Sequence, residues 1–248
     1  MTEPVIVLDR VSRAFGPKKV LAEASLKINA GEIVAILGAS GSGKSVTLKT
    51  INGLIVPDSG SVDVLGHRVN ELRERDLAPL RRRVSYLFQG GALFDSMTVF
   101  DNIAFPLREH LTMDSNQLAQ RVAALLAMVQ LDDVEHLAPS ELSGGMRKRV
   151  AVARALALEP EIILYDEPTT GLDPVTGEAI ANLILDLDRH LGVTSLVVTH
   201  DIPLILRVAE RVAFLEHGQF VFDGTLEAAR TSGSETVKRF FKAGVSHA

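Results

Sequence analysis

Residues 33–48 read IVAILGASGSGKSVTL, an apolar run followed by a glycine-rich loop and a helix-like stretch. In this context the pattern G-x-x-x-x-G-K-[ST] predicts a P-loop between a buried strand and a helix. Glycines let successive backbone N–H groups turn inward around a phosphate chain, and the positive end of the helix dipole acts on the same oxygens. The predicted phosphate-binding residues are Gly38, Ala39, Ser40, Gly41, Ser42, Gly43, Lys44, Ser45 and Val46.

Two side chains of this loop have distinct predicted roles. The ammonium of Lys44 is expected on the β- and γ-phosphate oxygens, and the hydroxyl of Ser45 is expected to bind Mg²⁺. A glycine–serine run on its own is more often a turn or a linker. The apolar run before this one and the helical pattern after it favour the P-loop.

The composition narrows the class of protein. The 248 residues are 46% hydrophobic and 23% charged, as in a globular protein, and the formal net charge of −5 argues against general nucleic-acid binding. There is no cysteine, which excludes disulfides and thiolate metal sites. No window approaches the roughly 18 apolar residues of a membrane span, and the N-terminus has no signal pattern. We therefore expect a cytosolic chain.

The N-terminal region alternates apolar and polar residues. Residues 4–15 and 20–28 fit two half-buried antiparallel strands joined by a turn at Gly16 and Pro17. Phe15, at the end of the first strand, is a candidate for stacking on a nucleotide base. An ordinary core phenylalanine is the alternative at this position.

A helical lobe is expected over residues 98–141, between two strands of the main sheet. Leu118, Val122 and Leu125 recur at helical spacing, and Asp114 and Gln117 form a capping-box pattern before them. A C-terminal helix is expected around residues 235–242.

An acidic pair ends the apolar run of residues 162–165. Such a continuous run is typical of a strand buried on both faces of a parallel sheet. Asp166 is then placed to hold Mg²⁺ through water, and Glu167 can reach the water that attacks a γ-phosphate. An acidic pair can also be a simple turn, but after a P-loop the catalytic interpretation is favoured.

Two further polar residues follow predicted strands. Gln89 ends the strand of residues 84–88, where it would contact Mg²⁺ or the attacking water, although a turn glutamine is the alternative. His200 follows the strand of residues 195–198. Ligands gather outside the carboxyl ends of parallel strands, so both should lie near the P-loop.

A second helix begins with a serine and two glycines, Ser143, Gly144 and Gly145, whose free backbone N–H groups form an anion-binding end. The basic run of residues 147–149 is read as a solvated or interdomain face. Asp173 should cap the next helix, with Pro174 in its first position.

Taken in order, these motifs resemble the ATP-binding subunits of ABC transporters over nearly the whole chain. Residues 38–45 match the family's Walker A motif, Gln89 its Q-loop, residues 142–146 its LSGGQ signature, residues 162–167 its Walker B motif with the catalytic Glu, residues 170–173 its D-loop, and His200 its switch histidine. Met146 departs from the signature, where Gln is usual.

The resemblance implies an α/β fold: a P-loop NTPase (RecA-like) core with a mainly parallel sheet, an N-terminal antiparallel β-subdomain and an inserted α-helical subdomain. We expect one ATP-binding domain over residues 1–248. Residues 1–97 and 142–225 would form the core and β-subdomain, residues 98–141 the helical subdomain, and residues 226–248 a C-terminal helix and tail.

The resemblance also implies the chemistry. ATP and Mg²⁺ would be the ligands. Glu167, His200 and Lys44 would be catalytic, while Ser45, Gln89 and Asp166 would hold the metal. Phe15, Ser143, Gly144, Gly145 and Asp173 would complete the nucleotide site.

Within the family, residues 88–95 and 146–149 look like the ATPases of Mla/Mce-type phospholipid transporters. This likeness implies a homodimer under two permease subunits at the cytoplasmic face of the inner membrane, with a STAS-type accessory subunit, a lipid-binding Mce-domain protein and no nucleic acid. Another cargo remains an alternative. A DNA-repair or ribosome-associated ATPase would need a long coiled coil or a second ATPase domain, and a phosphotransferase would leave Ser143 and His200 unexplained.

The segment after Gln89 is apolar and glycine-rich. Leu93 and Phe94 in such a loop predict a docking surface for a permease, and burial of both beneath the lobe is the alternative.

Overall fold

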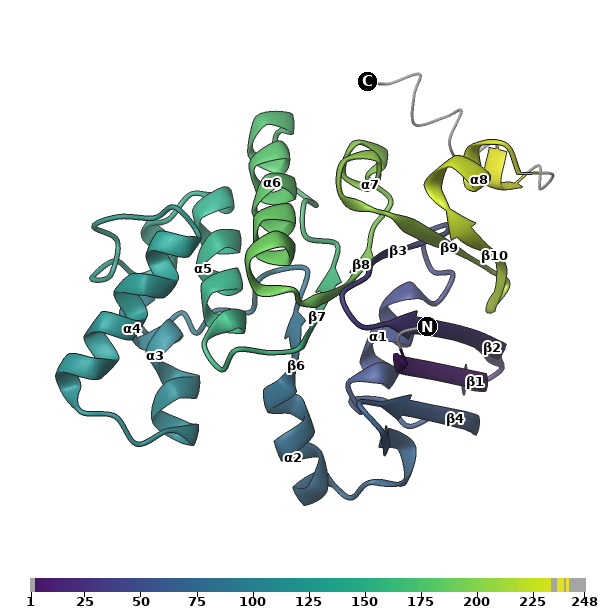
Figure 1. Cartoon of the computed structure of the whole chain (residues 1–248), viewed down its shortest axis with the longest axis horizontal. Coiled ribbons are helices and arrows are strands. Elements are labelled where there is room, and N and C mark those ends of the chain that lie inside the picture. The colour runs from purple at the N-terminus through teal and green to yellow at the C-terminus, as the bar shows by residue number, and fades with distance from the viewer. Residues whose placement is uncertain (1–2, 233–235, 239, 241–248) are drawn as a thin grey trace.

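Two β-sheets and a helical lobe make up the computed structural model, which describes residues 3–232, 236–238 and 240 (Figure 1). The smaller sheet is antiparallel, with the strand order β2-β1-β4-β5. Its strands are β1 (Pro4–Phe15), β2 (Lys18–Asn29), β4 (Ser59–Val64) and β5 (His67–Arg68). The alternating apolar residues of β1 point into the core, which confirms the predicted antiparallel β-subdomain.

The larger sheet has the order β10-β9-β3-β8-β7-β6. Its strands are β3 (Ile33–Leu37), β6 (Val84–Leu87), β7 (Ile162–Asp166), β8 (Thr194–Val198), β9 (Arg211–Glu216) and β10 (Gln219–Thr225). All neighbours are parallel except β9 and β10. Every residue of β3, β7 and β8 is buried, as expected for strands covered on both faces. The mainly parallel sheet is confirmed.

Helices cover both faces of this sheet. Helix α1 (Lys44–Ile51) contacts strands of both sheets and shares one apolar core with them. The other helices outside the lobe are η1 (Val69–Glu71), α2 (Glu74–Arg83), α5 (Gly144–Leu156), α6 (Pro174–Leu191), α7 (Ile202–Val208) and α8 (Leu226–Arg230). Helix α1 therefore packs between the two sheets. This packing fixes the position of its first turn.

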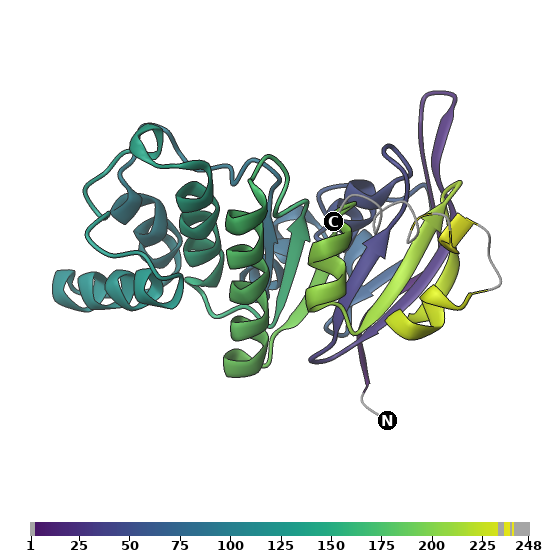
Figure 2. The same ribbon diagram turned by 90° about the horizontal axis from the view of Figure 1, so that it is seen from above.

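The lobe lies between β6 and β7 in the chain and extends to one side of the sheets (Figure 2). It contains α3 (Val99–His110), α4 (Ser115–Met128) and η2 (Pro139–Glu141). The predicted capping box is present: the Gln117 N–H donates to Asp114 at 2.9 Å, and the Asp114 N–H donates to the Gln117 side chain at 3.0 Å. Leu118, Val122 and Leu125 are buried on one face of α4.

The C-terminal helix was predicted over residues 235–242. Within this span the structure describes only residues 236–238 and 240, which are helical, and the rest of the prediction lies outside the described residues.

Candidate functional site

The loop of residues 38–45 connects β3 to α1 and owes its shape to two glycines. Gly38 has a φ of +152° and Gly43 a φ of +111°. A Cβ atom on Gly38 would lie 2.3 Å from the carbonyl oxygen of Leu215, and one on Gly43 would lie 2.9 Å from that of Val20. Both positions therefore require glycine for their backbone conformation and for the close approach of a neighbouring strand.

Lys44 is buried at the first turn of α1. Its Nζ donates hydrogen bonds to the carbonyl oxygens of Gly38 (2.9 Å) and Ala39 (3.2 Å). Burial lowers the pKa of this ammonium below its ordinary value, although the carboxylates of Glu167 and Asp166 act in the opposite direction. The ammonium of Lys44 thus lies across the opening of the loop of residues 38–45, and the geometry of this loop suits a phosphate chain.

Ser45 and Asp166, 121 residues apart in the sequence, meet at this loop. The Ser45 hydroxyl donates to Oδ1 of Asp166 at 2.7 Å, and the Tyr86 hydroxyl donates to Oδ2 at the same distance. A hydroxyl and a carboxylate are hard oxygen ligands of the kind that Mg²⁺ uses beside nucleotide phosphates, so these residues fit that ion. Within the described residues, no group of three or more His, Cys, Asp or Glu side chains could by itself hold a metal ion.

Glu167 follows Asp166 with its backbone in the left-handed region, at a φ of +52°. Its N–H donates to the carbonyl of Val198 at 2.8 Å, which ties it to the adjacent strand β8. One carboxylate oxygen accepts from the hydroxyls of Thr170 (3.1 Å) and Thr199 (3.3 Å), and the other lies 3.0 Å from Nδ1 of His200. Such an uncommon backbone conformation, held by several bonds, is typical of functional sites.

A cavity of about 630 Å³ opens at the carboxyl ends of β3, β6, β7 and β8. Lining it are Lys18, Val20, Gly38, Ala39, Ser40, Gly41, Gly43, Lys44, Ser45, Val46, Gln89, Glu167, His200 and Phe240. The predicted meeting of the P-loop with Gln89, Glu167 and His200 is therefore present in one cavity.

The second predicted anion-binding turn lies outside this cavity. Ser143 caps α5 by accepting from the Met146 N–H at 3.2 Å, and Asp173 caps α6 by accepting from the Val175 and Thr176 N–H groups at 3.1 Å. A Cβ atom on Gly145 would lie 2.3 Å from a methyl carbon of Thr176. The predicted Asp173 cap is confirmed and Ser143 also proves to be a cap, but neither segment lines the P-loop cavity of its own chain.

Phe15 is also outside the cavity lining. Its side chain is 45% exposed, and the guanidinium of Arg13 lies 4.9 Å from the ring centroid. The alternative that Phe15 is a core residue is therefore wrong. Its stacking on a base stays a prediction.

Lys148 is a residue that the sequence analysis misassigned. It is buried, not solvated, and its ammonium donates to the backbone carbonyl of Gln89 and, at 3.5 Å, to that of Glu167. Burial lowers its pKa, against the pull of Glu167 and Asp166. Its helical spacing from the buried Gly145 and Val152 was the one sequence signal available.

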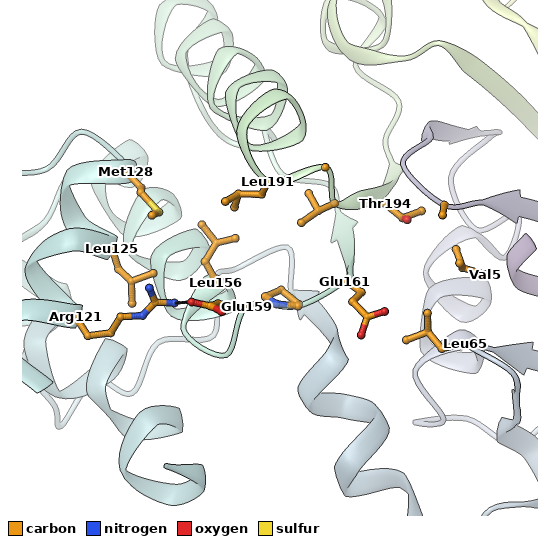
Figure 3. Close-up of a pocket in the computed structure, with 14 residues that line it drawn as sticks. Val5, Leu65, Arg121, Leu125, Met128, Leu156, Glu159, Glu161, Leu191 and Thr194 are labelled. Atoms are coloured by element: carbon orange, nitrogen blue, oxygen red, sulfur yellow. Dashed lines mark hydrogen bonds and ion pairs between the residues drawn. The ribbon is translucent and has the colours of Figure 1, made fainter. Parts of the chain in front are cut away.

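A second cavity, of about 420 Å³, lies at the amino ends of β7 and β8, between the lobe and the sheets (Figure 3). Arg121 and Glu159, which line it on the side of the lobe, form an ion pair of 2.8 Å. None of the predicted site residues lines this cavity, so the predicted chemistry is confined to the opposite edge of the sheet.

The parallel sheet, the glycine loop at its carboxyl edge and the acidic pair on the neighbouring strand define a P-loop nucleotide hydrolase. Residues 21–170 match the family described as ABC transporter, and the chain belongs to that family.

Several relatives are similar over most of the chain. The intermembrane phospholipid transport system ATP-binding protein MlaF of Escherichia coli K12 is 41% identical over 93% of this chain and 86% of its own length. The Haemophilus influenzae MlaF is 38% identical, over 98% and 92%. The probable ribonucleotide transport ATP-binding protein mkl of Mycobacterium tuberculosis H37Rv is 40% identical, over 95% of this chain and 66% of its own.

A solved structure has the same fold. It is a dimeric ATP-binding cassette in a post-hydrolysis state with ADP and Pi, and it matches 89% of this chain and 98% of its own with a TM-score of 0.82 at 35% identity. The chain is thus an ATP-binding, ATP-hydrolysing subunit of an ABC transporter.

Proposed function

We propose that this chain hydrolyses Mg²⁺-bound ATP to drive phospholipid transport between membranes of a bacterial envelope. The convergence of Lys44, the Ser45–Asp166 pair and the Glu167–His200 pair on one cavity supports the hydrolytic role. The cargo class rests on the similarity to MlaF over 93% of the chain.

Each side chain of the site has its own role in the proposed hydrolysis of ATP. Lys44 and the loop N–H groups hold the β- and γ-phosphates, while Ser45, Asp166 and Gln89 would hold Mg²⁺, which supplies charge neutralisation when bound. Glu167 accepts the proton of the attacking water. His200 holds Glu167 in place and contacts the γ-phosphate.

The chain acts as a homodimer in this proposal. Ser143, Gly144 and Gly145 lie at a helix N-terminus outside the cavity, which supports the proposal that they bind a nucleotide held by another copy. Each ATP then lies between the P-loop of one subunit and the Ser143 turn of its partner, with Asp173 at the interface and Phe15 on the base.

Residues 1–248 act as one ATP-binding domain, divided as expected from the sequence. Two permease subunits bind it at the cytoplasmic face of the inner membrane, with a STAS-type accessory subunit and a lipid-binding Mce-domain protein as further partners. None of the helices within the described residues is both long enough and apolar enough to cross a membrane.

The permease docks, in this proposal, at a groove of about 500 Å³ beside the lobe. Phe88 and Phe94 line it and are 39% and 43% exposed, and the ring of Phe94 lies 5.2 Å from that of Phe105. Leu93, by contrast, packs against the lobe core, as the alternative expected. Phe94 is therefore the better probe of docking.

The permease experiment compares Phe94→Ser with Leu111→Ser, a change of another exposed apolar residue of the lobe, which does not line the groove. Phe94→Ser should keep basal ATP hydrolysis and lose permease binding in a pull-down, whereas Leu111→Ser should keep both. Equal permease binding by the two variants would contradict docking at this groove.

The cargo is tested on the native complex. Purification with its permease and extraction of bound lipid should yield phospholipid, and an assay should find free phosphate as the product of ATP. A phosphorylated small molecule would point to a phosphotransferase. A complex without lipid that binds ribonucleotide would favour the cargo in the name of the mycobacterial relative.

A further inference from the structure

Tyr86 links two elements that the sequence separates by 80 residues. It lies on β6, the edge strand of the larger sheet, and its hydroxyl donates to Oδ2 of Asp166 on the neighbouring strand β7 at 2.7 Å. A hydroxyl bonded to a carboxylate at this distance forms a charge-assisted hydrogen bond, about twice as strong as a neutral one.

The two oxygens of Asp166 have different partners. Oδ1 accepts from Ser45, which belongs to the P-loop, and Oδ2 accepts from Tyr86, which does not line the nucleotide cavity. When a metal binds beside the P-loop, the Ser45 side of the carboxylate faces it. Tyr86 holds the opposite oxygen, so the carboxylate cannot turn about its side-chain bonds without losing this hydrogen bond.

The phenol itself is fixed by packing. Its ring lies 4.4 Å from that of Phe88, centroid to centroid, and packs against the apolar core between the two sheets. A ring held on two sides keeps its hydroxyl at one place, which is what a supporting group needs in order to orient a ligand.

We propose that Tyr86 is a positioning residue for the metal site: its hydroxyl orients Asp166 so that the carboxylate supports Mg²⁺ on the bound nucleotide. This inference rests on the Mg²⁺-dependent ATP hydrolysis proposed above. Groups that orient metal ligands typically change metal affinity or activity by about 10–100-fold when they are removed.

Tyr86→Phe removes the hydroxyl and keeps the ring. The chain offers a matched control, because Tyr165 is its only other tyrosine and lies next to Asp166 on β7. The Tyr165 hydroxyl is buried and faces the Ser195 hydroxyl rather than Asp166. Tyr165→Phe therefore removes a neighbouring hydroxyl without removing a bond to Asp166.

The primary measurement is binding of a fluorescent ATP analogue, mant-ATP, with EDTA and across a Mg²⁺ titration. Tyr86→Phe should keep the affinity measured in EDTA within about twofold, which also shows that its P-loop is folded. It should raise the Mg²⁺ concentration needed for half-maximal tightening by about 10-fold or more. Tyr165→Phe should match the wild type in both conditions.

A double-mutant cycle shows whether Tyr86 acts through Asp166. In an Asp166→Ala background the further change Tyr86→Phe should leave the Mg²⁺ titration unchanged, because the side chain that Tyr86 orients is already absent. Additive losses in the double variant would overturn the inference, as would a wild-type Mg²⁺ titration for Tyr86→Phe. A wild-type chain whose nucleotide binding ignores Mg²⁺ would instead refute the proposed function.

Discussion

The P-loop and the Ser143 turn are alike in sequence and unlike in what surrounds them. Each places glycines and a serine at the start of a helix, α1 in one case and α5 in the other. Around the P-loop, Asp166 bonds to Ser45, and Gln89, Glu167 and His200 line the same cavity. The Ser143 turn does not line this cavity. The Ser143 hydroxyl instead caps its own helix.

This difference indicates how the nucleotide site is divided between the P-loop and the Ser143 turn. In the proposed function the P-loop side supplies the general base Glu167 and the metal ligands Ser45 and Asp166. The Ser143 side offers the N–H groups at the start of α5, with Thr176 and its hydrogen-bond partner Asp173 beside them. Under the proposed function, two half-sites of this kind would complete each other when two chains face each other.

The largest expected effect concerns the base on the P-loop side. Glu167→Gln removes the proton acceptor while the amide can still bond to Thr199 and His200, so hydrolysis should fall by about 10²–10⁴-fold with ATP binding retained. Phosphate release measures the rate, and size-exclusion chromatography should detect a dimer held by ATP. Wild-type turnover would show that Glu167 is not the base.

Lys44→Ala comes next. Each hydrogen bond to a charged group contributes about 1.5–3 kcal/mol, so loss of the ammonium should weaken ATP binding by about 10–100-fold or more. Binding of the nucleotide is measured by fluorescence, beside a melting curve. Lys49→Ala is the matched control, because it removes the same charge from the last turn of the same helix and does not line the cavity. A folded Lys44→Ala chain with normal turnover would refute the P-loop site.

The smallest expected effect comes from Ser143→Asp. This variant tests the difference between the P-loop and the Ser143 turn most directly. Aspartate caps helices as well as serine does, so α5 should persist while a negative charge faces the partner's phosphates. Turnover should fall about tenfold, with nucleotide binding by the isolated subunit unchanged. Ser143→Asn, a neutral cap, is the control.

Mixing two impaired variants tests directly whether the site is divided between two chains. A heterodimer of Lys44→Ala and Ser143→Asp chains has one site with both defects and one with neither. The mixture should therefore hydrolyse ATP faster than either variant does alone. No recovery in a mixture that contains heterodimers would contradict a shared site.

Much of this protein follows from local sequence. The P-loop glycines, the buried run of β7 with its acidic end, the capping box of the lobe and the Asp173 cap each depend on residues within a few positions of one another. Their order along the chain, with strands alternating with helices, then predicts a parallel sheet and gathers the polar ends at one edge. The sequence determined these elements because backbone conformation and periodicity are set by near neighbours.

The tertiary structure alone decided which distant side chains touch. The Tyr86 bond to Asp166 requires β6 to lie beside β7 in a particular register, and Lys148 reaches Gln89 only because α5 packs across the end of that strand. Exposure of Phe94 beside a half-buried Leu93 likewise depends on how the lobe sits on its loop. The Tyr86–Asp166 and Lys148–Gln89 contacts join residues 80 and 59 positions apart, and no local pattern encodes them, because they arise when buried faces find each other in the folded chain.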